Sequence, residues 1–436
     1  MPTRRSLLQT AGAAVVYQLA DKGPVLRAAS VNDQVNLGFI GSGIRGTQLI
    51  EDHKSIAGVN CLAVVDLYDG CLQRAKEQIN GQIMTGKDYR AILDRKDIDA
   101  VVIAVPDHLH KKLTLDALSA GKHVYIEKPM TWSLAEGPQI IAAEKAAGKV
   151  LQVGSQAKSS ALTAKAREIV KSGQLGRVHM VRMSNHRNNA QGAWKYAIPP
   201  DASPETIDWP KFLGHYKGKP FDARTFFQWR CWWEYSGGVA TDLYVHLLTW
   251  LHEVMQVEAP RAVSSHGGIF KWNDGRTVPD YMNTLFDYDG FVADVYVNLE
   301  TSVPSRPWTI HGTDAAMWEE RGKLVVTKEP VDNDVQGYGT YQWPKAMREQ
   351  YYIGKGYLPN GRPKEPLPPR PEPETITIDR GLTHAEHFIQ SIRTGKPSVE
   401  NATEGHYAAG AAHVANASYR QKRRLEWNHK TNKVRG

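Results

Sequence analysis

Short apolar runs alternate with amphipathic stretches along the first third of the chain. Runs such as Ala100–Val105 are apolar at every position, which is the pattern of strands buried on both faces of a parallel sheet. Between the runs, apolar residues recur at helical spacing. The alternation predicts a doubly wound parallel sheet with helices on both faces. The predicted strands cover residues 35–40, 61–65, 100–105, 124–126 and 150–154, and the predicted helices cover 44–57, 69–80, 89–93, 111–120 and 134–148.

The pattern changes after about residue 156. Shorter strands now follow one another without intervening helices, which favours a largely antiparallel open sheet. A proline-rich stretch, Lys364–Glu374, indicates a linker or surface loop. We therefore predict an α/β fold with a doubly wound domain over residues 31–156 and a C-terminal α+β domain over residues 157–436. Its predicted strands cover 178–183, 261–265, 281–288, 292–299, 309–312 and 323–326, and its helices cover 162–172, 384–394 and 404–420.

A glycine-rich turn, Gly41-Ser42-Gly43-Ile44-Arg45-Gly46, joins the first predicted strand to the first predicted helix. The first glycine permits the tight turn, the second lets the backbone approach a pyrophosphate, and the third permits close helix–strand packing. The N-terminus of the helix then faces the phosphates. This context predicts a dinucleotide-binding Rossmann domain, with Gly41, Gly43, Ile44, Arg45 and Gly46 at the cofactor.

Asp66 ends the second predicted strand, at the place where Rossmann domains carry an acid that binds both ribose hydroxyls. A carboxylate there repels a 2′-phosphate, so Asp66 favours NAD over NADP. The alternative for Asp66 is a helix N-cap.

Other candidate residues also lie at the ends of predicted strands. Ligands of open α/β sheets bind outside the carboxyl ends of the strands. This shared position is stronger evidence for a cofactor site than any one motif. The candidates at these ends are Gly41, Asp66, Pro106, His110, Glu127 and Lys128.

Composition excludes several function classes. The 436 residues suffice for two cores, and the formal charge of +8 is spread along the chain rather than clustered. The nearest basic patch, Gln421–Arg424, has no groove-reading motif beside it, so we expect no nucleic-acid partner. Cys61, Cys71 and Cys231 are far apart and form no C-x-x-C pattern, which argues against a metal site or a disulfide framework.

The first thirty residues form a separate segment. Thr3-Arg4-Arg5-Ser6-Leu7-Leu8-Gln9 resembles a twin-arginine export signal, and the apolar stretch Ala11–Ala20 is too short to span a bilayer. We find no other stretch that spans a membrane, and we expect export to the periplasm. This route carries folded proteins, often with a cofactor already bound. The alternative is a disordered basic tail.

The stretch "GKHVYIEKPM", Gly121–Met130, follows the glycine-rich unit and a "VPDHLH" strand end. Together these motifs resemble the Gfo/Idh/MocA oxidoreductases, closely over Val35–Gln156 and more loosely beyond. The resemblance implies that Lys128 lies beside the nicotinamide and the reacting sugar hydroxyl, with Glu127 orienting the lysine or the cofactor amide. It also implies a cis peptide bond before Pro129, and a homodimer or homotetramer formed through a sheet face.

Asp242 and His246 are four residues apart in "TDLYVHLLTW", a spacing that places both on one face of a helix. A carboxylate beside an imidazole fixes its tautomer and raises its basicity. The resemblance makes His246 a catalytic base or proton relay, with Asp242 supporting it or binding substrate. The alternatives are a core histidine with an acid nearby, or a metal pair whose further ligands the sequence does not offer.

Hydroxyl-rich ligands need convergent hydrogen-bond donors and an aromatic platform. The polar and aromatic segment from Asn185 to Tyr235 contains both. The candidate substrate contacts in it are Asn185, His186, Arg187, Trp194 and Trp229.

These observations favour an NAD-dependent oxidoreductase that acts on a hydroxyl of a sugar, polyol or glycoside, with a cofactor that stays bound and is recycled. One alternative is a glycosidase that uses NAD transiently through oxidation, elimination and re-reduction, as some exported relatives do. Another is a non-catalytic sugar or nucleotide sensor, against which the intact Lys128, Asp242 and His246 argue.

Overall fold

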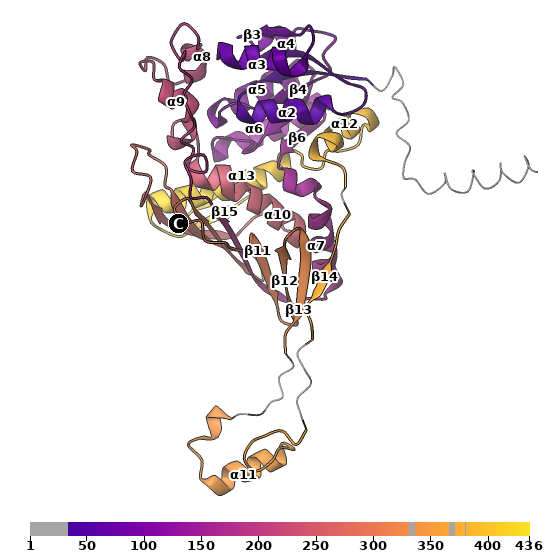
Figure 1. Cartoon of the computed structure of the whole chain (residues 1–436), viewed down its shortest axis with the longest axis vertical. Helices are drawn as coiled ribbons and strands as arrows, with labels where there is room; N and C mark the ends of the chain where they lie inside the picture. Colours follow the sequence, from indigo (N-terminus) through magenta and orange to yellow (C-terminus); the bar gives the residue numbers. More distant parts are fainter. Residues whose placement is uncertain (1–33, 331–334, 336, 366–370, 380) are drawn as a thin grey trace, which may run out of the picture.

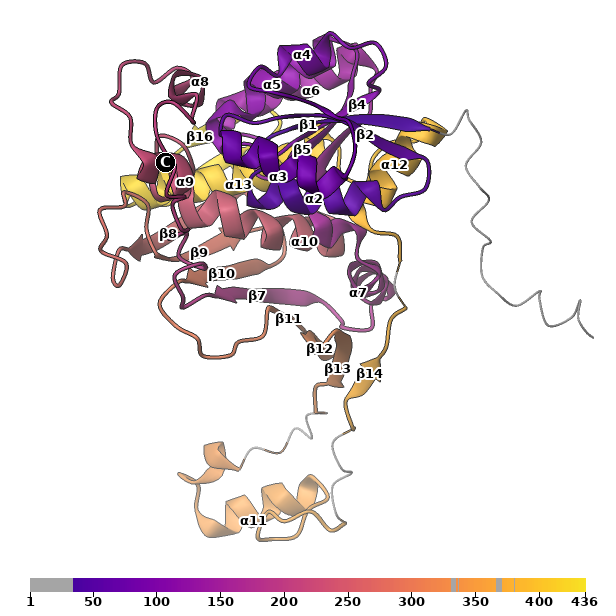
Figure 2. The same cartoon turned by 45° about the horizontal axis from the view of Figure 1, so that its top comes forward.

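The computed structural model describes residues 34–330, 335, 337–365, 371–379 and 381–436. The twin-arginine-like segment, and part of the proline-rich stretch, lie outside these described residues. The chain forms two layered domains, a helix-covered parallel sheet and a broad open sheet with helices between the two (Figures 1 and 2). Within the described part, no helix is both long and apolar enough to cross a bilayer.

The first domain is a parallel sheet, and the described residues give it six strands in the order β3-β2-β1-β4-β5-β6. This is the Rossmann order, in which all strands are parallel and the order of strands along the sheet reverses between β1 and β4. The prediction of a doubly wound parallel sheet is therefore confirmed. Its elements are β1 (Val35–Ile40), α2 (Ile44–Lys54), β2 (Val59–Val65), α3 (Asp69–Ile79), β3 (Met84–Gly86), α4 (Arg90–Leu93), β4 (Ala100–Ile103), α5 (Asp107–Ser119), β5 (His123–Glu127), η2 (Leu134–Glu136), α6 (Gly137–Ala147) and β6 (Leu151–Gly154).

Each face of this sheet has its own core. On one face Val101, Ile103 and Val124 pack with residues of α5 and α6, and on the other Leu37 and Val102 pack with residues of α2. Helix α12 (His384–Thr394), near the end of the chain, packs on the second face through Phe388 and Ile389. The C-terminal part of the chain thus completes the N-terminal core.

Helix α5 begins earlier than predicted. The sequence predicted a helix from Lys111, with Pro106 to His110 as the end of a strand, but the strand ends at Ile103 and the helix starts at Asp107. Pro106 occupies the N-cap position, and a carboxylate in the first turn, at Asp107, suits the positive end of the helix dipole. Asp107 and His110 are therefore helical residues that face the core.

The second domain is built on a sheet that has ten strands within the described residues, in the order β14-β13-β12-β11-β7-β10-β9-β8-β15-β16. Only the β7–β10 pair among those described is parallel, so the prediction of a largely antiparallel sheet is confirmed. Its strands are β7 (Val178–His186), β8 (Ala262–Gly268), β9 (Tyr281–Asp287), β10 (Val292–Asn298), β11 (Trp308–Gly312), β12 (Ala315–Glu320), β13 (Lys323–Lys328), β14 (Glu374–Ile376), β15 (Leu425–Asn428) and β16 (Lys433–Arg435).

Helices cover the face of this sheet that is turned toward the first domain (Figure 2). Leu248 and Leu251 of one helix pack with Ala411 and Ala415 of another in the largest apolar core. The elements on this side are η3 (Gln156–Ser159), α7 (Ala161–Ser172), η5 (Ala240–Tyr244), α10 (Val245–Met255) and α13 (Ala402–Gln421).

The segment between β7 and η5 returns to the first domain. It contains α8 (Trp209–Leu213), α9 (Ala223–Phe227) and η4 (Trp229–Cys231). Its residues 199–208, which we term the strap, lie against the end of β2. Tyr68 and Ile207 form a β-bridge there, Asp69 N–H donates to Thr206 O at 3.1 Å, and Asp208 N–H donates to Leu67 O at 2.8 Å.

An arm leaves the second sheet after β13 and returns at β14 (Figure 1). It contains η6 (Tyr338–Thr340) and α11 (Lys345–Gly354), which lie away from the rest of the chain in both views. Buried Tyr352 holds this small unit together, with its hydroxyl 3.0 Å from the Thr340 hydroxyl.

Candidate active site

The glycine-rich turn leaves room for a ligand at one position only. Gly41 has φ +92°, and a Cβ there would lie 2.3 Å from the Ala104 carbonyl oxygen. A Cβ on Gly46 would lie 2.2 Å from the Gly41 oxygen, so this glycine permits the helix to pack closely. A Cβ on Gly43, by contrast, would meet nothing within 4 Å. Gly43 caps the exposed N-terminus of α2, and the next residue, Ile44, is 60% exposed. This open cradle fits a pyrophosphate.

Asp66 is held in a fixed direction beside that turn. One carboxylate oxygen accepts the Ser42 N–H at 2.7 Å, and the other accepts the Tyr68 N–H at 2.9 Å. Burial raises the pKa of Asp66, although these backbone donors oppose the shift. An oriented acid next to the glycine turn fits the ribose of a dinucleotide. The residues present therefore fit NAD.

The end of β5 carries the charged pair that the sequence singled out. The Lys128–Pro129 peptide bond is cis, which confirms the prediction. Arg45 donates from Nε to Glu127 Oε1 at 2.8 Å, so the glycine turn is tied to this strand end. Glu127 thus orients Arg45, and Lys128 is directed elsewhere.

Lys128 reaches into the second domain. Its Nζ lies 2.9 Å from both Asp242 Oδ1 and the Asp242 carbonyl oxygen. Arg230 Nε donates to the same Oδ1 at 3.0 Å. Burial alone would raise the pKa of Asp242, but the ammonium of Lys128 and the guanidinium of Arg230 hold it far below its ordinary value. The three side chains form a charged cluster between the domains.

Asp242 does not pair with His246 as the four-residue spacing suggested. It lies in η5, a π-helical turn that precedes α10, and its carboxylate is committed to the two cations. Such turns change the direction of side chains and recur at functional sites. Arg230 is the residue that sequence reasoning missed, because nothing local to "WRCWW" links it to a residue twelve positions away.

His246 is half-buried in the first turn of α10. Burial, followed by the positive charge of Lys128, lowers the pKa of His246 to about 3, against the opposing charge of Asp242. The imidazole is therefore neutral at ordinary pH, and its unprotonated nitrogen is able to accept a hydrogen bond from a hydroxyl.

His110 is not a cofactor contact. The ring is buried, with one nitrogen 2.7 Å from the Pro129 oxygen and the other 2.8 Å from the Val105 oxygen. His110 thus joins the segment after the cis bond to the loop that follows β4. Pro106, also predicted at the cofactor, is half-buried beside the glycine turn, where a Gly41 Cβ would touch Val105.

The predicted substrate contacts divide into two groups. Asn185 and Arg187 lie at and just beyond the end of β7, on the side of Val181 and Met183 that faces the helices. Trp229 is half-buried and stacks with Arg230, whose guanidinium lies 4.1 Å from the ring centroid. These three lie near the charged cluster.

Two predicted contacts are wrong. His186 has the opposite orientation on β7, where its ring nitrogen Nδ1 lies 2.7 Å from the Val303 oxygen on the outer face of the sheet. Trp194 is 1% exposed and packs in the main core of the second domain. Alternation along the strand explains the first error, and burial explains the second.

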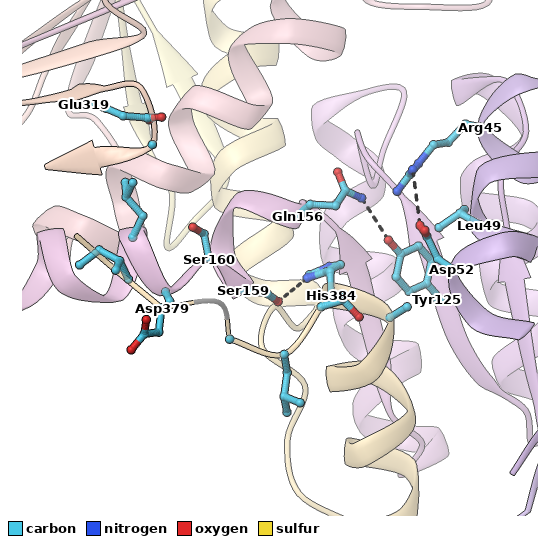
Figure 3. A pocket seen from close by; sticks show the side chains of 18 residues that line it. Arg45, Leu49, Asp52, Tyr125, Gln156, Ser159, Ser160, Glu319, Asp379 and His384 are labelled. Carbon is cyan, nitrogen blue, oxygen red and sulfur yellow. Dashed lines mark hydrogen bonds and ion pairs between the residues drawn. The ribbon is translucent and has the colours of Figure 1, made fainter. Parts of the chain in front are cut away.

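A separate cavity of about 580 Å³ is lined by Arg45 on one side and His384 on the other (Figure 3). Arg45 and Tyr125 border it on the first domain, and the hydroxyl of Ser159 lies 2.6 Å from His384 Nδ1 on the other side. His384 Nε2 also contacts the Val153 oxygen at 2.7 Å. His384 thus joins η3 to β6, and Lys128 and His246 are not among the residues that line this cavity.

Comparison with known proteins identifies two family models along the chain. Residues 35–155 match the model described as "Oxidoreductase family, NAD-binding Rossmann fold", and residues 167–427 match "Oxidoreductase family, C-terminal alpha/beta domain".

Curated relatives match over shorter stretches. An α-N-acetylgalactosaminidase of Shewanella oneidensis is 34% identical over 140 residues, which are 30% of this chain and 28% of that protein. An uncharacterized oxidoreductase of Bacillus subtilis, YrbE, is 29% identical over 152 residues, 35% of this chain and 44% of that protein. The match therefore spans less than half the length of these relatives.

Solved structures match over nearly the whole chain. A levoglucosan dehydrogenase in complex with NADH and levoglucosan has a TM-score of 0.63 at 18% identity, covering 90% of this chain and 99% of that one. The aldose–aldose oxidoreductase of Caulobacter crescentus, complexed with glycerol, has the same TM-score, identity and coverage. At this identity the likeness establishes the fold.

Replacing Gly41 should reduce the stability of the protein, whereas replacing Gly43 should reduce its affinity for the cofactor. Gly41→Ala forces a Cβ against a carbonyl at positive φ, so we expect it to destabilise the protein by at least ~1–3 kcal/mol. Gly43→Ala meets open space, so its melting temperature should equal that of the parent while its affinity for NADH falls at least ~10-fold. Thermal melts without cofactor and NADH fluorescence titrations measure the two effects. A Gly43→Ala variant with parental NADH affinity contradicts the assignment of the cradle.

Because the pKa of Asp107 is raised, we expect the stability of the protein to depend on pH in an unusual way. Burial, opposed by Arg230 and reinforced by Asp242, raises the pKa of Asp107 to about 7. Between about pH 4 and 7 the unfolded chain has lost this proton while the folded chain retains it, so the group lowers stability as pH rises. Asp107→Asn removes that loss. Relative to the parent, its free energy of unfolding should rise by roughly a few kcal/mol from about pH 4 to pH 8.

Urea unfolding at several pH values measures this difference. Asp289→Asn is the matched control, since the Asp289 side chain is 95% exposed and should give a difference that is flat with pH. A flat difference for Asp107→Asn as well would show that Asp107 is ionised in the folded protein.

Proposed function

The chain belongs to the Gfo/Idh/MocA family of NAD-binding oxidoreductases, and we propose that it oxidises a hydroxyl of a sugar, polyol or glycoside. The observation that carries this proposal is the cluster of Lys128, Asp242 and Arg230 beside neutral His246. It lies at the carboxyl edge of the parallel sheet, where the ligands of such sheets bind.

The residues of this chain would hold NAD along that edge. Gly43 and the N-terminus of α2 would receive the pyrophosphate, and Asp66 would bind the ribose hydroxyls. When bound, NAD supplies a hydride acceptor for the carbon that carries the hydroxyl. The oriented acid at Asp66 supports NAD over NADP as the cofactor.

The protein supplies the proton chemistry and the positioning. His246 is neutral, so it is able to take the proton that the hydroxyl loses. Lys128 is fixed by Asp242, with two bonds of 2.9 Å, and its third N–H would be donated to the oxygen as it becomes a carbonyl. Arg230 keeps the Asp242 carboxylate in place from the other side.

Sugar substrates are supported by the proteins that share this fold. One solved relative is a dehydrogenase with levoglucosan bound, and another is an aldose–aldose oxidoreductase. Half-buried Trp229 offers this chain an aromatic face of the kind that sugar rings stack on.

The similarity to the α-N-acetylgalactosaminidase of Shewanella oneidensis supports a second candidate, a glycosidase that regenerates NAD within each turnover. The two candidates differ in one observable. A dehydrogenase accumulates NADH from a free sugar, whereas the glycosidase releases the leaving group of an aryl glycoside with no net NADH.

We further propose that the protein is exported through its twin-arginine-like segment with NAD already bound. The strap beside Asp66 supports retention of the cofactor, because it packs against the end of β2. Denaturing the purified protein and identifying released nicotinamide by mass spectrometry tests this. Protein that is empty as isolated and exchanges added NAD freely contradicts it.

We expect Lys128→Met to lose catalytic turnover while it keeps its affinity for the cofactor. We expect kcat to fall at least ~100-fold, since the proton-transfer and electrostatic contributions disappear. NADH affinity should stay within about threefold, because the cradle at Gly43 and Asp66 is intact. Lys112→Met, at an exposed lysine of the same domain, is the control for loss of charge. Parental turnover in Lys128→Met protein that binds NADH contradicts the proposed role.

Asp66→Ala predicts a change in cofactor preference. The affinity for NAD should fall roughly 10-fold or more, and that for NADP should fall less, because the carboxylate that repels a 2′-phosphate is gone. Titration of NADH and NADPH fluorescence measures both. Equal losses for the two cofactors would remove the basis for choosing NAD.

A further inference from the structure

Positive charge exceeds negative charge around His246. Lys128 and Arg230 share the single carboxylate of Asp242, and Arg187 adds a third cation. Asp107, the other acid nearby, offsets the excess only in part, because burial raises its pKa to about 7 and it is therefore only partly ionised at neutral pH. The site therefore carries a surplus of positive charge at neutral pH.

The guanidinium of Arg187 has no carboxylate partner among the residues that the structure describes. Its Nε donates to Asn185 Oδ1 at 3.1 Å, which fixes its direction. Across the described ranges of the chain, no carboxylate lies within ion-pair distance of Arg187. A half-buried cation without a counter-ion leaves a charge that an anionic ligand is able to compensate.

Arg187 and Arg230 act on the same groups. Burial raises the pKa of the Tyr196 hydroxyl, and the charges of Arg230 and then Arg187 oppose that shift. The charge of Arg187 also helps to lower the pKa of His246. Arg230 uses Nε for Asp242 and lies flat over the Trp229 ring at 4.1 Å. The charges of both arginines thus reach Tyr196 and His246, and Gln228 Nε2 donates to the Tyr196 carbonyl oxygen at 2.7 Å, which joins the segment before Arg230 to that of Tyr196.

We propose that the substrate carries a carboxylate, as a uronic acid does, and that Arg187 with Arg230 binds this group. The terminal nitrogens of a guanidinium match the two oxygens of a carboxylate, whereas a neutral sugar leaves the surplus charge uncompensated. Binding at one end of the sugar then presents a ring hydroxyl to His246 and Lys128. The inference rests on the proposed function and specifies its substrate class.

The test is calorimetric binding to NADH-loaded protein, which requires no turnover. The probes are D-glucuronate and D-galacturonate, each against its neutral counterpart, D-glucose or D-galactose. We expect at least one acid to bind ~30-fold or more tightly than its counterpart, which is the usual contribution of a charge-assisted hydrogen bond. High salt should reduce this preference.

Three variants distinguish a specific role of Arg187 from a general effect of positive charge on the protein. Arg187→Gln should remove the preference for the acid and leave the affinity for the neutral sugar within about threefold, and Arg187→Lys should restore part of the preference. Arg182→Gln is the matched control. It removes one positive charge from the same strand, but Arg182 lies on the outer face and pairs with Asp294 at 3.0 Å. Thermal melts confirm that each variant is folded.

The outcomes distinguish this inference from the proposed function. NADH formation from neutral sugars, with no acid preferred by the parent, overturns the inference and leaves the function standing. Tight, Arg187-dependent binding of an acid with no NADH formed from any sugar supports the inference and contradicts the function. Equal weakening of acid and neutral sugar by Arg187→Gln also overturns the inference, because it shows a structural role.

Discussion

The carboxylate of Asp242 is the interaction on which the rest of the site depends. It belongs to the second domain, yet it holds Lys128 from the end of a strand in the first. It also holds Arg230, so that two cations lie side by side around one anion. Removing one partner of a buried ion pair typically costs about 3–5 kcal/mol, because the other charge is left without compensation. The contact therefore fixes the position of the reactive lysine and the mutual placement of the two sheets.

This arrangement also sets the net charge of the site around Asp242. Arg230 and Lys128 share a single acid, while burial keeps His246 neutral and leaves Asp107 only partly ionised at neutral pH. The result is a base that is not already protonated beside a lysine that remains in place. The π-helical turn at Asp242 matters for the same reason, because it directs the carboxylate toward the cations and away from the histidine.

Local sequence patterns predicted the features that depend on local forces. Five strands of the Rossmann sheet and the glycine turn with Gly41 and Gly46 follow from nearby residues, whereas β3 was not predicted and the cis bond at Pro129 came from the family resemblance. Contacts across the chain were beyond that reasoning. Arg230 gains its role only when η4 meets η5, and Phe388 joins a core that includes Leu37, more than 300 positions away. Trp194 looked like a sugar platform because composition does not distinguish a buried indole from an exposed one.

The strap at residues 199–208 gives the molecule a second connection between its domains, next to Asp66. Backbone hydrogen bonds to Leu67 and Asp69, with the hydroxyl of Tyr68 donating to Asp201, make this connection independent of the charged cluster. Separation of the two domains beside Asp66 therefore requires these backbone hydrogen bonds to break as well as the contacts of the charged cluster.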